Sequence, residues 1–120
     1  MTALQAMRAV FDAWEKGDPE ALRVLFASDG VYLDPLKAGP LEGPEAIVEG
    51  NRPAMAAITD CRITVSLAME DGDHAVIEGM FASQLADSGA RFDFPFVAIT
   101  EMSDGRIKRL AEYFDTRPLG

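Results

Sequence analysis

The stretch Cys61-Arg-Ile-Thr-Val-Ser-Leu-Ala-Met69, followed by Glu-Asp71-Gly72, decides the fold of this chain. Apolar residues occupy every second position from Ile63 to Met69, which is typical of a β-strand with one buried face. Asp71-Gly72 is a hairpin turn signal. A strand of this kind, closed by a turn, predicts an antiparallel sheet in the second half of the chain.

Three more strands are expected after this turn. The first covers about 75–84 and is followed by a loop at 86–90. The second carries Phe92, Phe94 and Phe96 and runs to about 102. Asp104-Gly105 forms the next turn signal and leads into a last strand over 106–114. The four strands together predict an antiparallel meander.

In the first half of the chain, apolar residues are spaced as on one face of a helix. Leu4, Met7, Phe11 and Trp14 follow the i, i+3, i+4 rhythm of a helix that Gly17 ends.

A second helix is expected from Asp18-Pro19, since an N-cap residue is followed there by proline at the first helical position. A short strand at 31–34 and a loop at 35–43 come next. Pro44 opens a third helix, which Pro53 is expected to kink or split.

Helices followed by a run of strands predict an α+β fold in one domain over 1–120. We expect a cone-shaped, curved antiparallel sheet wrapped over three N-terminal helices. Such an arrangement leaves a cavity between the layers.

Composition limits the partners. The 120 residues are 48% hydrophobic and carry a net charge of −9. That charge argues against nucleic acid and against anionic membrane surfaces. No signal peptide or apolar run of transmembrane length is visible, and the single Cys61 cannot form an internal disulfide, so a cytoplasmic protein is expected. No Cys/His spacing indicates a metal, and no cofactor is expected.

Several motifs together resemble the ketosteroid isomerase and SnoaL-like branch of the nuclear transport factor two superfold, over nearly the whole chain. The motifs are Gly17-Asp18, Leu25-Phe26-Ala27, Asp34-Pro35, Gly43 with the helix after it, and Asp104-Gly105-Arg106-Ile107. The resemblance implies a cone with a buried pocket and puts Asp34 at the position of the general base. The positions of that enzyme's two oxyanion donors fall on Val10 and, approximately, on Val97.

The segments Tyr32-Leu33-Asp34 and Glu112-Tyr113-Phe114-Asp115 are also similar to limonene epoxide hydrolases. In that likeness Tyr32 and Asp34 match a Tyr and an Asn that help to hold a water, and Glu112 matches a catalytic Asp. The Arg and Asp of those hydrolases fall on Gly79 and Phe81.

Strand parity supports a pocket with acid–base chemistry. Glu112 alternates with Leu110 and Phe114, and Tyr32 shares parity with Asp34. An apolar setting raises the pKa of a carboxyl group toward neutrality, which suits a general acid or base. The candidate catalytic residues are Asp34 as base and Glu112 or Tyr32 as acid or hydrogen-bond donor. The expected pocket lining is Trp14, Met55, Phe81, Val97 and Leu110.

Plainer interpretations of these residues stay open. Asp34 could serve only as a turn or cap residue before Pro35. Glu112 could be a surface residue paired with Arg109 or Arg117, and Tyr32 could simply complete the core.

The predicted function is a small-molecule enzyme that transfers a proton next to a carbonyl group without a cofactor, as an isomerase, cyclase or hydro-lyase. Its ligand would be a small apolar carbonyl compound. The alternative is a non-catalytic binding or association domain that uses the same cavity for a small apolar ligand.

Phe92, Phe94 and Phe96 stand at even positions and Val97 at an odd one, so they point to the opposite face of the strand. Since Val97 is expected to line the pocket, the three rings are predicted to lie on the outer face of the sheet. Three rings left in water would forgo roughly 1.5–3 kcal/mol each. A homodimer through the sheet is therefore expected. The alternative is that the three rings line the cavity.

Overall fold

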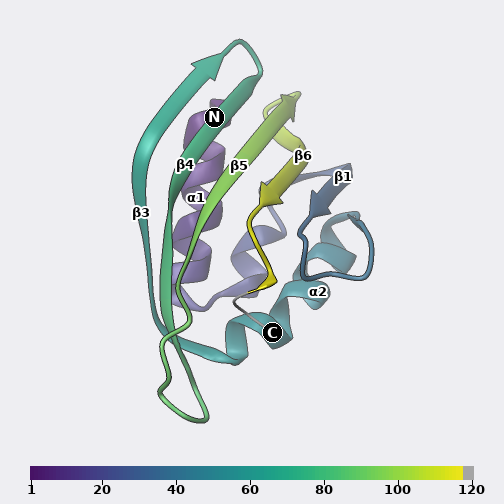
Figure 1. The fold of residues 1–120 in the computed structure, drawn as a ribbon. Helices are drawn as coiled ribbons and strands as arrows, with labels where there is room; N and C mark the ends of the chain where they lie inside the picture. The colour runs from purple at the N-terminus through teal and green to yellow at the C-terminus, as the bar shows by residue number, and fades with distance from the viewer. Residues whose placement is uncertain (118–120) are drawn as a thin grey trace.

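Six strands form one curved, open sheet in the computed structural model, which describes residues 1–117 (Figure 1). The strand order is β2-β1-β6-β5-β4-β3. β1 pairs in parallel with β6, and all other neighbouring pairs are antiparallel. The predicted α+β class is confirmed, with a mixed sheet. The strands are β1 Phe26–Leu33, β2 Leu41–Glu42, β3 Ile58–Asp71, β4 His74–Leu85, β5 Phe94–Ser103 and β6 Arg106–Tyr113.

Two α-helices and one short 3-10 helix accompany the sheet. α1 (Ala3–Lys16) begins with a capping box between Thr2 and Gln5 and ends at Gly17 in the left-handed conformation. The second predicted helix is only the 3-10 turn η1 (Pro19–Leu22). α2 (Pro44–Ala56) continues through Pro53 without splitting and ends three residues after it, so the expected break does not divide the helix.

β1 starts at Phe26, although the sequence predicts a strand only from 31. Gly30 allows this extension, since a Cβ there would lie 2.9 Å from the carbonyl oxygens of Ala27 and Ile107. The strand register shifts between Phe26 and Val31. β2 also lies in the segment predicted as a loop. Both differences arise from pairing with distant strands, which local patterns do not report.

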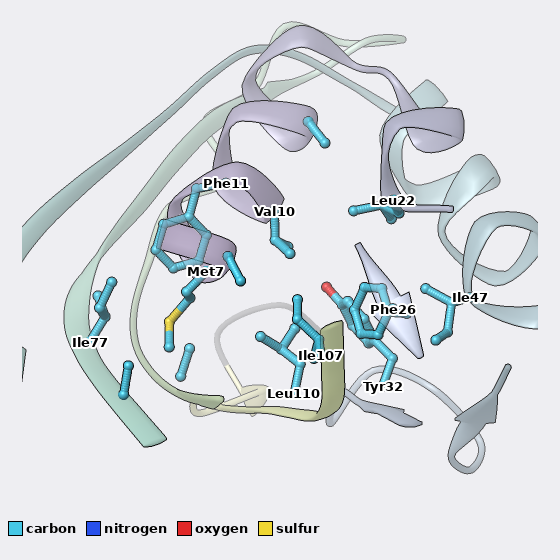
Figure 2. Packing of buried hydrophobic residues seen from close by; sticks show 14 of the residues in the cluster. Met7, Val10, Phe11, Leu22, Phe26, Tyr32, Ile47, Ile77, Ile107 and Leu110 are labelled. Atoms are coloured by element: carbon cyan, nitrogen blue, oxygen red, sulfur yellow. The ribbon is translucent and has the colours of Figure 1, made fainter. Parts of the chain in front are cut away.

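The core lies between α1 and the concave face of the sheet. Figure 2 shows Met7, Val10 and Phe11 of α1 directed toward the sheet, where Ile77 and other apolar side chains lie. α2 covers the β1 end of the sheet (Figure 1). Burial of these side chains is worth about 1.5–3 kcal/mol each before the entropy of ordering is counted. This packing fixes the strands that carry the candidate site.

The parity predicted for β5 is wrong. Phe94 and Phe96 are 8% and 5% exposed and point into the cone. Val97 pairs with Glu78 and with the exposed Tyr113, so it lies on the outer face. Both faces of β5 are largely apolar, and the pattern therefore could not decide which of them faces inward.

Across residues 1–117, no helix combines the length and the apolar character that a membrane crossing needs.

Candidate active site

A cavity opens between α1 and the concave face of the sheet, and seven aromatic rings form most of its wall. Stacking holds the rings together: the Phe94 centroid lies 4.8 Å from that of Phe81 and 4.3 Å from that of Phe114. The cavity is lined by Phe11, Trp14, Asp34, Leu36, Lys37, Ala54, Ile58, Ile63, Phe81, Phe92, Phe94, Phe96, Glu112 and Phe114.

The enclosed part of the cavity is small. Its volume is about 60 Å³. One water needs about 10–15 Å³, so this space holds only a few waters. A ligand larger than one small ring must therefore extend through the mouth or displace a side chain.

Glu112 of β6 is the titratable group with the clearest perturbation. It faces the cavity, in keeping with the parity shared with Phe114. Burial of the carboxyl raises its pKa to about 7, and the negative charge of Asp34 adds to the rise. The hydrogen bond from Tyr32 and the charge of Lys37 act in the opposite direction. A carboxyl group with a pKa near neutrality can give or take a proton under ordinary conditions.

Tyr32 of β1 lies directly behind Glu112. The side chain is fully buried, and its hydroxyl donates a hydrogen bond to Glu112 Oε1. Burial, followed by the charge of Glu112, raises the pKa of Tyr32 well above its ordinary value, so the phenol keeps its proton. The Trp14 indole lies close enough to lower the pKa of Tyr32, although no acceptor within residues 1–117 meets its Nε1–H with good geometry. Tyr32 thus orients Glu112 from inside the core.

Asp34 follows the last residue of β1 and combines a turn with the cavity wall. Its Oδ1 accepts a hydrogen bond of 2.7 Å from the Leu36 N–H, and its backbone oxygen accepts one of 3.0 Å from the Lys37 N–H. These bonds make the turn expected for an Asp before Pro35. The same residue lines the cavity with Glu112. The turn role expected for Asp34 is therefore present, and the residue also lines the cavity, while its role as the base stays a prediction.

Lys37 is a cavity residue that the sequence did not indicate. It belongs to the loop between β1 and β2, where no periodic pattern tells which way a side chain points. The side chain is half-buried and lines the cavity, and it is the one cation among the lining residues. None of the ion pairs found in residues 1–117 includes it.

The predicted pocket lining is only partly in place. Trp14 and Phe81 line the cavity. Leu110 is buried in the core, and Met55 lines a separate depression that also holds Cys61. Val97 lies on the outer face, as the pairing of β5 requires. The rings of Phe92, Phe94 and Phe96 take the places that Met55, Val97 and Leu110 were expected to fill.

Cys61 lies outside this cavity and lines the separate depression beside it. Burial raises the pKa of the Cys61 thiol to about 12, which keeps it protonated and poorly nucleophilic. Among residues 1–117, no group of three His, Cys, Asp or Glu side chains is placed to hold a metal ion.

Comparisons with known proteins agree with this architecture. The sequence model of the SnoaL-like domain matches residues 7–110. No curated protein matches the sequence. A hypothetical protein with a ketosteroid isomerase-like fold from Catenulispora acidiphila, solved in complex with trimethylamine, is 26% identical. The match has a TM-score of 0.83 and covers 96% of this chain and 88% of that one.

Two other solved structures share the fold at lower identity. A candidate SnoaL-like polyketide cyclase from Jannaschia sp. CCS1 is 15% identical, with a TM-score of 0.84 over 98% of this chain and 88% of that one. An epoxide hydrolase of the LEH-like type from M. tuberculosis is 21% identical, with a TM-score of 0.78 over 95% and 83% of the two chains.

Proposed function

Since the chain belongs to the SnoaL-like family, we propose that it is a cofactor-free acid–base enzyme acting on a small carbonyl compound. Asp34 would be the base and Glu112 the proton donor. The observation that carries the proposal is the presence of these two carboxyl groups on one aromatic cavity, where the pKa of Glu112 is about 7. A carboxyl group whose pKa is raised by burial is suited to the acid role beside a second carboxyl group.

The proposed reaction moves one proton and keeps the atoms of the substrate. The Asp34 carboxylate takes a proton from the carbon next to the carbonyl, and the electron pair of the C–H bond becomes the C=C bond of an enol. The carbonyl oxygen receives the Glu112 proton, which Tyr32 helps to orient. Return of the proton from Asp34 to another carbon, and of the enol proton to Glu112, completes an isomerisation. An aromatic wall excludes water and strengthens these interactions.

An isomerisation assay tests the proposal with a defined probe. A β,γ-unsaturated cyclohexenone becomes its α,β-isomer by this proton shift, and the conjugated product is followed by ultraviolet absorbance. We expect turnover by the natural chain and a loss of about 100-fold or more in Asp34→Asn and Glu112→Gln, the usual scale of general acid–base catalysis. Asp29→Asn in β1, the strand that leads to Asp34, and Glu101→Gln in β5 are matched controls and should keep full turnover. Equal activity of all five proteins, or none in the natural chain, would contradict the proposal.

A second candidate is non-catalytic binding of a small alkylammonium ion. Aromatic rings surrounded by carboxylates attract such cations, and the Catenulispora structure is a complex with trimethylamine. Titration of this chain with trimethylammonium chloride, followed by the fluorescence of the single Trp14, tests this candidate. Lys37 counts against it, since a cation already lines the same cavity.

A further inference from the structure

The geometry points to Lys37, on the loop between β1 and β2, as the residue that selects ligands with a carboxylate group, while the apolar part of the ligand lies among the rings. The inference rests on the proposed function, since it names the substrate class as carbonyl compounds that also carry an acidic group. Its basis is the unequal distribution of charge around the cavity wall.

The first step concerns the position of Lys37. Asp34 and Lys37 are joined by a turn, in which the Lys37 N–H donates to the Asp34 backbone oxygen at 3.0 Å. A second hydrogen bond, from the Leu36 N–H to Asp34 Oδ1, fixes the same turn. The segment is thus held by its own bonds, and the lysine side chain it carries lines the cavity.

The second step concerns the charge that Lys37 faces. Its positive charge reaches Glu112 across the cavity and lowers the pKa of that carboxyl. No carboxylate lies within 4.0 Å of Lys37 in residues 1–117, although this chain has many acidic residues. The other lysines differ: Lys16 pairs with Asp12 at 2.8 Å, and Lys108 is exposed on β6. Lys37 therefore keeps its donors available to an incoming anion.

The third step concerns selectivity. The wall otherwise consists of apolar groups and two carboxyl groups, which disfavour an anion deep in the cavity. A ligand anion is acceptable only where Lys37 compensates for it, with its apolar part inward. This gives the ligand a single orientation, in which a ring or chain contacts the stacked phenylalanines and the carboxylate lies against Lys37. A charged pair at a partly exposed position contributes more to specificity than to affinity.

Benzoate and benzamide are the probes, because they have the same shape and differ in charge. Binding is measured by Trp14 fluorescence and by calorimetry at pH 6, where most of the Glu112 carboxyl is protonated. We expect the natural chain to prefer benzoate by about tenfold, which corresponds to about 1.4 kcal/mol. Lys37→Met should remove the preference, with a larger loss for benzoate than for benzamide. Lys37→Arg and the exposed control Lys108→Met should keep it.

Two results would overturn the inference: a natural chain that binds both probes equally or neither of them, or a Lys37→Met variant that still prefers benzoate. Circular dichroism of Lys37→Met confirms that the variant is folded. The test is separate from that of the proposed function, since the cyclohexenone probe carries no anion. Absence of isomerisation together with a benzoate preference rejects the proposed enzyme and keeps the ligand class. Isomerisation without a benzoate preference keeps the proposed enzyme and rejects the ligand class.

Discussion

At the scale of single residues, Glu112 makes folding stability depend on pH. Its pKa in the folded chain is about 7, against an ordinary value of 4.5. Between these pH values the folded chain keeps a proton that the unfolded chain loses, so stability falls as the pH rises from about 4.5 to 7. Glu112→Gln removes this penalty and keeps an acceptor for Tyr32. We expect the variant to gain about 1–3 kcal/mol at pH 8 and little at pH 4. Urea unfolding at pH 4 and pH 8 measures the gain in stability. An equal gain at the two pH values would refute the raised pKa of Glu112.

The same group gives the proposed reaction a pH profile. Glu112 must be protonated to act as the acid, so kcat/KM should fall as the pH rises through about 7. Tyr32→Phe deletes the hydrogen bond that lowers the pKa of Glu112. The falling limb should therefore move to higher pH in this variant. The cyclohexenone assay over a pH series measures the falling limb of the natural chain and of Tyr32→Phe. If the limb lies at the same pH in both proteins, a group other than Glu112 controls the profile.

At the scale of elements, β4 depends on a residue without a side chain. A Cβ at Gly79 would overlap the Thr64 carbonyl oxygen of β3 and approach the Phe96 ring to 3.2 Å. Gly79→Ala should destabilise the chain by about 1–3 kcal/mol, the usual cost of overpacking. Gly39→Ala is the control, since a Cβ there meets nothing within 4 Å. Thermal unfolding compares the two, and an equally stable Gly79→Ala variant would contradict the close packing of β3 on β4.

The elements also show what the sequence could and could not predict. The hairpin turn at Asp71-Gly72 followed from a local signal, and the parity that Glu112 shares with Phe114 placed it on the cavity. The alternation from Ile63 to Met69 was only partly right, because the register of β3 shifts between Val65 and Leu67 and leaves Leu67 and Met69 exposed. The parity of Phe94 could not be predicted, because both faces of β5 carry apolar residues. Lys37 could not be found at all, because its position depends on a turn and on a strand, β6, more than sixty residues away.

At the scale of the whole molecule, the outer face of the sheet carries an exposed apolar patch, whereas the phenylalanines expected there line the cavity. Leu67, Met69, Met80 and Tyr113 form the patch and are 43–57% exposed. We propose that a second copy of the chain covers this face, since a two-fold axis would place the same patch against itself.

Leu67→Lys tests the dimer at a position opposite Glu78, where the monomer tolerates a cation. Sedimentation should show a dimer for the natural chain and a monomer for this variant. Val24→Lys, at an exposed apolar residue outside the sheet face, should stay dimeric. A monomeric natural chain at tens of micromolar would reject the dimer.

The parallel junction of β1 with β6 has a consequence for how the protein is made. Tyr32 lies beside Leu110 in this junction, so residues from opposite ends of the sequence must meet before it forms. Closing so long a loop is slow compared with forming the β3–β4 hairpin. A nascent chain still lacking its last strand would hold Asp34 and most of the aromatic wall, but not Glu112. The proposed acid–base pair would therefore first exist when the final strand docks, and synthesis would yield no partly active intermediate.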